Sequence, residues 1–493
     1  MVVNQTMVEN PVIIQGGMGA GVSSWRLAQA VSLQGQLGVV SGTALDQILI
    51  RRLQDGDPGG PMLRGMKAFP FPAMAERIYG EYFIPGGKSQ QAPYRLVPAH
   101  TMDNPREVVE LCIVSNFVEV FLAREGHENP VGINYLEKIQ MAHLPSIYGA
   151  MLAGVGYVLM GAGIPLKIPG VLDRLAEHLP VEYALHVTGA QEGESYAMHF
   201  DPLEYMDQAL PPLPRPKFLP IVSSNTLAAT MLKKANGRVD GLVIEMRKAG
   251  GHNAPPRGKL QISDAGEPVY GERDAVDVEK LCELGVPFWL AGGYGHPDKV
   301  REALAQGATG VQVGTAFELA AESGLQADYK AALLARAREG RGDVFTDPLA
   351  SPTGFPFKVA RLEGTCSEPE VYEARARVCD VGYLREAYRT PEGEIGYRCS
   401  SEPLSLYKAK GGEADDTVGR KCICNALLAN IGHPQARNGG RIEQALVTAG
   451  DDLNSVVQFL PEGRGDYCAA DVIATLLEGR AVAAVGDEVR KAV

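Results

Sequence analysis

The sequence predicts an α/β fold, a TIM (β/α)8 barrel with a long insertion after its second strand and a cysteine-containing carboxyl-terminal domain. Two observations predict the barrel: eight short β-rich runs alternate with helical stretches, and several of these runs end in glycine turns. A third observation, the length, predicts the additions, because 493 residues exceed what a single barrel needs. A doubly wound open sheet is the alternative that the same alternation allows.

The predicted strands are short apolar runs, as expected of parallel strands that are buried on both faces. In chain order they are residues 11–15, 38–41, 131–135, 157–160, 218–223, 241–244, 287–291 and 310–313. Helices are predicted at 26–34, 227–235, 277–284, 297–306 and 326–337. One surplus run, YALHV at 183–187, either belongs to an insertion between the fourth and fifth strands or replaces one of the eight.

Two regions fall outside the repeating pattern. Residues 43–129 form the insertion, which contains helical stretches and the aromatic sequence FPFP at 69–72. Residues 359–493 are polar, contain most of the cysteines and have a predicted helix at 469–477. We therefore assign residues 1–358 to the barrel and residues 359–493 to a mostly helical second domain.

Charge and hydropathy exclude several kinds of partner. The net charge is −12 and no long run of Lys and Arg is present, so the chain lacks the electrostatic signature of nucleic-acid binding. The first residues lack a basic segment followed by an apolar one, as a secretory signal would have. Residues 146–169 are apolar, but Pro165 and Pro169 and several glycines favour a soluble segment over a membrane span. We expect a cytoplasmic protein.

The main catalytic candidate is His252, which follows Gly250 and Gly251 after the predicted strand 241–244. The glycines permit a positive φ and close approach to a ligand. In a barrel, the carboxyl ends of the strands carry the chemistry, and a neutral imidazole can accept or donate a proton near pH 7. The alternative is a tight turn in which the histidine only caps or packs.

Two glycine turns predict a phosphate site. Gly292 and Gly293 follow the seventh strand, and Gly314 and Thr315 follow the eighth, so their backbone N–H groups would be neighbours at the usual phosphate site of a barrel. The glycines at 16–21 do not have the GxGxxG spacing of a dinucleotide-binding domain. A phosphate-bearing cofactor is therefore favoured over a Rossmann-type NAD domain.

Five motifs, in order, resemble one family. They are PVIIQGGMGAGVSSWRLAQAV from residue 11, VGINY at 131, GLVIE with AGGH at 241–252, LAGGYGHPDKVREAL at 290 and GATGVQVGTAFELAAES at 307. Together they are similar to the nitronate monooxygenase (2-nitropropane dioxygenase) and FMN-dependent enoyl-acyl-carrier-protein reductase family. The resemblance covers about residues 10–325 and implies a TIM barrel that binds FMN.

The resemblance also implies roles for individual residues. His252 matches the family's catalytic histidine. The cofactor-binding residues implied by the resemblance are Gln15, Gly16, Gly17, Met18 and Asn134 at the flavin ring, Gly250 and Gly251 beside His252, and Gly292, Gly293, Gly314 and Thr315 at the phosphate. Read from the sequence alone, Asn134 equally fits a capping residue at a strand end.

Two features depart from the family pattern. The loop 253–258 is stiff and carries Arg257, which either selects an anionic substrate or a carrier phosphate or faces solvent. The FPFP sequence would suit a longer acyl chain, although such aromatic clusters are more often core.

The carboxyl-terminal cysteines predict a metal site. SPTGFP at 351–356 and GRKCICNALLANIG at 419–432 are similar to an iron–sulfur branch of the family, the decenoyl-acyl-carrier-protein dehydrogenase/isomerase. This second resemblance implies a [4Fe–4S] cluster on Cys379, Cys399 and Cys422, with Cys366 or Cys424 as the fourth ligand. The same thiols would suit zinc, or are free structural cysteines.

The sequence thus predicts an FMN-dependent oxidoreductase that is nitronate monooxygenase-like and uses the flavin with a histidine acid or base. The alternative substrate is an enoyl or acyl thioester of fatty-acid or polyketide metabolism, with NAD(P)H as a possible electron donor and acyl carrier protein as a possible partner. A homodimer is expected. Two further alternatives are a non-catalytic flavin-binding interaction module and a flavin-free phosphate-binding isomerase or aldolase; no obvious Schiff-base lysine supports the last.

Overall fold

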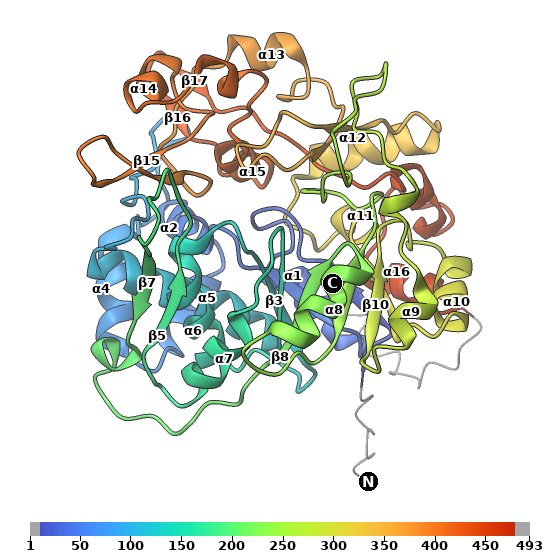
Figure 1. The fold of residues 1–493 in the computed structure, drawn as a ribbon, viewed down its shortest axis with the longest axis horizontal. Helices are drawn as coiled ribbons and strands as arrows, with labels where there is room; N and C mark the ends of the chain where they lie inside the picture. The colour runs from blue at the N-terminus through green and yellow to red at the C-terminus, as the bar shows by residue number, and fades with distance from the viewer. Residues whose placement is uncertain (1–9, 479–493) are drawn as a thin grey trace.

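The computed structural model describes residues 10–478, and eight parallel strands form its central sheet in the order β1-β11-β10-β9-β8-β4-β3-β2 (Figure 1). The strands are β1 Ile13–Gln15, β2 Gly38–Ser41, β3 Val131–Leu136, β4 Tyr157–Gly161, β8 Lys217–Val222, β9 Leu242–Glu245, β10 Phe288–Ala291 and β11 Gly310–Val313. The sheet closes between its first and last strands, because the Gln15 N–H donates to Leu37 O at 2.9 Å and the Leu37 N–H donates to Ile13 O at 3.1 Å. The (β/α)8 barrel is confirmed, and each of the eight predicted runs supplies one of its strands.

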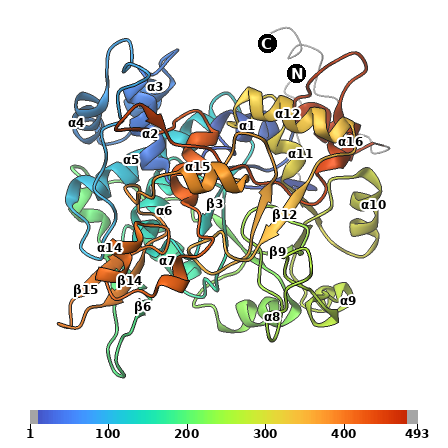
Figure 2. The ribbon, with the colours of Figure 1, turned by 90° about the horizontal axis from the view of Figure 1, so that it is seen from above.

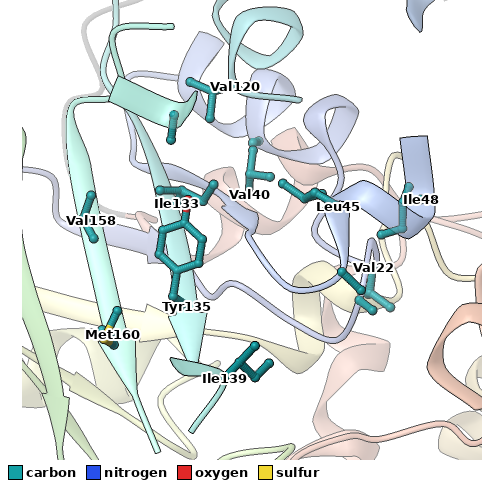
Figure 3. Packing of buried hydrophobic residues seen from close by; sticks show 14 of the residues in the cluster. Val22, Val40, Leu45, Ile48, Val120, Ile133, Tyr135, Ile139, Val158 and Met160 are labelled. Carbon is teal, nitrogen blue, oxygen red and sulfur yellow. The ribbon is translucent and has the colours of Figure 1, made fainter. Parts of the chain in front are cut away.

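The barrel interior is a packed core and not a pore, as in other barrels of this size. The inward side chains form one cluster, made of Ile14, Leu37, Val39, Tyr157, Leu159, Leu219, Val243, Trp289 and Ala291. The next residue along a strand points outward, because side chains alternate with a period of two. Figure 3 shows the outward residues Val40 and Ile133 beside Val120 of the insertion.

Helices surround the barrel. They are α1 Trp25–Leu33, α6 His143–Leu152, α7 Ile168–Ala176, α8 Asn225–Lys234, α9 Val278–Cys282, α10 Pro297–Ala305, α11 Thr315–Glu318 and α12 Ala327–Arg338. Sequence signals explain several of the ends: Ser224 caps α8 by accepting from the Leu227 N–H, and proline opens α10. Within the described part of the chain, no helix combines the length and the apolar character that a membrane crossing requires.

The surplus run lies outside the barrel. Its residues belong to β5 Val181–Ala184, which pairs antiparallel with β7 Ala197–Phe200, and to β6 Val187–Thr188, which pairs with β14 Glu386–Arg389. The first alternative is therefore correct: the run belongs to an insertion between the fourth and fifth barrel strands.

The insertion after β2 folds into helices that pack against the barrel. These are α2 Leu45–Gln54, α3 Pro61–Lys67, α4 Pro72–Tyr82 and α5 Arg106–Arg124. Phe69 and Phe71 are each only 2% exposed, and Phe69 contacts Phe117 edge to face with ring centroids 5.0 Å apart. The FPFP sequence is therefore core, and the acyl-chain interpretation of it is wrong, because burial leaves neither ring free for a ligand.

The carboxyl-terminal region lies over one end of the barrel and is less helical than we expected (Figures 1 and 2). Its elements are β12 Val344–Asp347, β13 Phe357–Ala360, α13 Pro369–Ala374, β14, β15 Ile395–Arg398, α14 Leu404–Ala409, α15 Ile423–Asn430, β16 Ala436–Arg437, β17 Arg441–Ile442 and α16 Ala469–Leu476. Frequent glycine and proline residues keep these elements short. The last of them, α16, returns to pack against α1.

Two glycines within helices test the packing of the insertion. Gly149 of α6 faces α5, and a Cβ there would lie 2.1 Å from Ile113 O, whereas Gly80 of α4 is exposed with no atom within 4 Å of a Cβ. We expect Gly149→Ala to lower the free energy of unfolding by ~1–3 kcal/mol through overpacking. Gly80→Ala should raise it by up to ~1 kcal/mol. Thermal unfolding midpoints of both variants measure the difference, and an unchanged midpoint for Gly149→Ala would contradict the close α5–α6 contact.

Candidate active site

A cavity lies at the carboxyl ends of the barrel strands. The loops after β1, β2, β3, β4, β9, β10 and β11 form its floor and walls. The carboxyl-terminal region supplies the remaining wall through Tyr383, Leu384, Ile423, Cys424, Leu427, Thr448, Gly450 and Asp452. The cavity therefore occupies the position of the active site in barrel enzymes. The carboxyl-terminal region, called the tail below, covers it.

Gly292, Gly293, Gly314 and Thr315 come together at one end of this cavity. Gly292 has φ +88°, and a Cβ there would lie 2.6 Å from Met246 O, so both the conformation and the space require glycine. The tail closes this end, because the Gly450 N–H donates to Thr315 Oγ1 at 2.9 Å.

The adjoining part of the wall contains Gly16, Gly17, Met18 and Asn134; a Cβ on Gly314 would lie 3.4 Å from Met18 Sδ. The Asn134 Nδ2 donates to Gly17 O at 3.1 Å, and a Cβ on Gly17 would lie 2.4 Å from the Asn134 Cβ. Asn134 Oδ1 is buried and has no partner among the described residues. This amide therefore faces the cavity with an unused hydrogen-bonding group.

Gln15 does not line the cavity. Its side chain is fully buried, its Nε2 donates to Ser23 Oγ at 2.8 Å, and its Oε1 accepts from the Val39 N–H at 3.0 Å. These bonds tie β1 to β2 and to the first glycine loop. Gln15 therefore positions the loop, while Gly16, Gly17 and Met18 form the surface.

Gly250, Gly251 and His252 all line the cavity. The His252 Nε2 lies 2.7 Å from Ser351 Oγ, and the ring contacts Phe357 edge to face with centroids 4.9 Å apart. Burial lowers the pKa of His252 to about 4, so the imidazole is neutral at pH 7. Its hydroxyl partner comes from the SPTGFP sequence, which the tail places against the histidine loop.

A second hollow shares residues with the first, including Glu245 and His252. Its wall contains Ile164, Leu227 and Arg257. The Arg257 side chain is exposed, and its backbone N–H donates to Asp274 Oδ1 at 2.8 Å. The two hollows together allow a ligand to extend from the central cavity toward a surface cation.

The sequence did not single out three carboxyl groups that line the central cavity, Glu245, Glu318 and Asp452. Burial raises the pKa of Glu245 to about 8, and burial with the neighbouring Asp452 raises the pKa of Glu318 to about 8. Glu245 ends β9, so its position at a strand end was a usable signal. Asp452 lies far along the tail, and no local pattern indicates that it reaches the barrel.

The carboxyl-terminal thiols lie near one another, but not as a tight group. A hydrogen bond with Cys399 and burial raise the pKa of Cys379, while burial together with Cys422 and Cys379 raises the pKa of Cys424. Cys366 lies apart from Cys379 and Cys399 in these interactions; its pKa is raised to about 11 by burial, and its Sγ donates to Gln444 O at 3.7 Å. The pKa of Cys366 is also raised by Cys422, so Cys366 and Cys424 both adjoin the group, and Cys424 in addition lines the cavity.

Residues 217–341, from β8 to the end of α12, match the family model described as nitronate monooxygenase. A curated nitronate monooxygenase from Paraburkholderia phytofirmans is 30% identical over 182 residues, which are 36% of this chain and 46% of that protein. The chain thus matches less than half the length of this relative. The resemblance predicted from the sequence is confirmed, and the matched region contains His252 and the two glycine turns.

The fold is also similar to several solved structures at low sequence identity. FabK from Thermotoga maritima has a TM-score of 0.46 at 16% identity, covering 95% of this chain and 92% of that chain. A nitroalkane oxidase from Streptomyces ansochromogenes has a TM-score of 0.44 at 15% identity, covering 94% of both chains. The enoyl reductase domain of MlnA from Bacillus amyloliquefaciens has a TM-score of 0.46 at 13% identity, covering 94% and 91%.

The raised pKa of Glu245 predicts a pH-dependent stability. The folded protein holds this proton up to about pH 8, whereas the unfolded chain releases it near 4.5, so stability falls as pH rises between these values. Because glutamine cannot ionise, Glu245→Gln should match the wild type at about pH 5 and melt at a higher temperature at about pH 9. Thermal unfolding across this range measures the slope. Glu283→Gln, on the surface, is the control, and parallel curves for wild type and Glu245→Gln would refute the assignment.

Proposed function

We propose that this chain, which carries a nitronate monooxygenase-family region at residues 217–341, is an FMN-dependent oxidoreductase that acts on an enoyl or acyl thioester. One observation carries the proposal. A single cavity at the barrel mouth contains the glycine turns suited to a phosphate, an amide wall suited to a flavin ring, and His252. Nitronate oxidation on the same site is the second candidate.

The wall of the cavity fits a flavin ring. Asn134 Oδ1 and Gln312 Oε1 are buried without partners among the described residues, although buried polar atoms are nearly always hydrogen-bonded. A flavin ring presents both N–H and carbonyl groups, which these amides would bind. Gly16 and Gly17 would allow the ring to approach the backbone closely.

The phosphate would lie beside the turns that follow β10 and β11. Backbone N–H groups near Gly292, Gly293 and Gly314 would hold it, and the Lys248 stem, beside Gly293, brings a cation to this end of the cavity. Glu318 and Asp452 also lie here. Because burial raises the pKa of both, they carry less negative charge against a phosphate than two ionised carboxylates would.

Bound FMN would supply the exchange of a hydride or electrons, and the chain would handle the proton. His252, neutral at pH 7, would orient the substrate and accept a hydrogen bond or a proton, with its ring held by Ser351 and Phe357. Glu245 still carries its proton at pH 7 and lines both hollows, so it is suited to donate one.

The second hollow favours the larger substrate. An acyl chain or carrier arm would extend from the central cavity past Ile164 and Leu227 toward Arg257, whereas a small nitronate would not reach these residues. That cation would suit the phosphate of an acyl carrier protein as partner. NAD(P)H would be the electron donor. A non-catalytic flavin-binding module would instead contain flavin that no NAD(P)H or thioester reduces or oxidises.

We also propose an iron–sulfur cluster on Cys379, Cys399, Cys422 and Cys424, close to the flavin. A single zinc ion fits less well, because four thiolates around zinc lie about 3.8 Å apart, and no three described tail thiols have all their sulfur atoms within 4.8 Å. An iron–sulfur core is larger and holds its ligands farther apart. Iron and acid-labile sulfide in anaerobically purified protein measure the cluster, and their absence would leave free thiols.

The phosphate assignment is tested by a pair of glycine variants. Gly292 and Gly285 both have positive φ, but a Cβ at Gly292 clashes with the cavity backbone, whereas one at Gly285 has nothing within 4 Å. We expect Gly292→Ala to lose FMN and Gly285→Ala to retain it, with similar backbone strain in each. Flavin released by acid from the purified variants measures occupancy. Full occupancy in a folded Gly292→Ala protein would remove these turns from the phosphate site.

The role of His252 is tested by replacement. We expect His252→Ala to retain FMN and to lose turnover by ~100-fold or more, because a positioned proton-transfer group is removed. Ser351→Ala should cause a smaller loss, since the imidazole remains but its hydroxyl partner does not. NAD(P)H-dependent reduction of an enoyl thioester and oxidation of an alkyl nitronate are the two assays. Near-normal turnover of both substrates by His252→Ala would exclude the role.

A further inference from the structure

Three metal-ligating side chains that the flavin site does not use converge inside the insertion. Asp46 lies in α2, Cys112 lies in α5, and His100 lies in the loop between α4 and α5. The His100 Nε2 is 3.1 Å from Asp46 Oδ2 and 3.7 Å from Cys112 Sγ. All three ligand atoms lie within 4.8 Å of one another, and each residue is at most 3% exposed.

Hydrogen bonding alone explains this arrangement poorly. The carboxylate and the sulfur both approach the same ring nitrogen, which carries at most one hydrogen to share between them. One hydrogen therefore does not account for both contacts.

The geometry instead matches a tetrahedral metal. Zinc bonds of about 2.0 Å to nitrogen and oxygen and 2.3 Å to sulfur place the nitrogen about 3.3 Å from the oxygen and about 3.6 Å from the sulfur. The observed distances are 3.1 and 3.7 Å. One carboxylate and one thiolate would also neutralise a divalent ion, which removes the cost of burying its charge.

Hydrogen bonds from Tyr383 and Gln47 orient the carboxylate of Asp46. Tyr383 donates its hydroxyl to Asp46 Oδ1, and the Gln47 N–H donates to the same oxygen at 2.6 Å, so Oδ2 is left to face His100. Such outer hydrogen bonds are typical of metal-bound carboxylates. The Tyr383 ring also packs edge-on to the His100 ring, with centroids 5.3 Å apart.

We propose that Asp46, His100 and Cys112 bind one divalent transition metal of the zinc class, with a fourth coordination position left for a non-protein ligand. The metal would join three segments of the insertion that are separate in the sequence. Through Tyr383, which also lines the central cavity, it links the insertion to the tail. The site is independent of FMN, so it can be present whether or not the proposed reaction is correct.

The first experiment counts metal in the full chain, purified without chelator. We expect about one zinc per chain by elemental analysis, lost in Cys112→Ala and in His100→Ala and retained in Cys282→Ser, which changes an exposed cysteine. Cys379→Ser, in the tail, should also retain it, which separates this metal from any bound to the tail thiols. Equal zinc in wild type and Cys112→Ala, or none in wild type, would overturn the proposal.

A second measurement does not depend on folded variants. Exchange of the wild-type metal for Co²⁺ should give a thiolate-to-cobalt charge-transfer band together with the ligand-field bands of a four-coordinate ion. Retention of the same spectrum in Cys379→Ser would exclude this tail thiol as the source of the band. A cobalt spectrum without thiolate ligation would exclude the site as proposed.

Discussion

Two backbone hydrogen bonds hold the loop of His252 in place. The Lys358 N–H donates to Gly251 O, and the Asn253 N–H donates to Pro356 O, each at 2.9 Å. They fasten the loop of His252 to the tail as a short antiparallel pair, and Ser351 then reaches the imidazole. The barrel supplies the floor of the cavity, but the histidine stands in a defined place only because the tail binds its loop. Positioning by rigid neighbours of this kind is what a catalytic side chain needs.

Burial has opposite effects on the pKa values of His252 and Glu245. It lowers the pKa of His252 and raises the pKa of Glu245, so both are uncharged at pH 7 although they lie in one cavity. Neither group therefore adds charge to the cavity in which we propose a phosphate. In this proposal backbone donors bind the phosphate, and the neutral side chains of His252 and Glu245 transfer protons.

The strands were predictable because each is a compact apolar run, and Gly292, Gly293 and Gly314 were predictable because glycine turns follow two of these runs. His252 was predicted to face the mouth because it follows a barrel strand, whereas the place of Asn134 at the flavin was implied only by the family resemblance. Gln15 shows the limit of this reasoning: it ends a strand, but its side chain turns to Ser23 and Val39 and closes the sheet. The positions of Asp452, Ser351 and Tyr383 depend on long-range packing, for which a single sequence carries no local signal.

The cavity wall draws on residues from Gly16 to Asp452, nearly the whole described chain. This span has a consequence for the order of events during synthesis. The first strand must wait for β11 before the sheet can close, and the barrel mouth stays uncovered until the segment around Thr448 has emerged. Contacts so distant in sequence form slowly, and partly folded barrels expose apolar surface meanwhile. A ligand that occupies the cavity can therefore be enclosed only late, when almost all of the chain has left the ribosome.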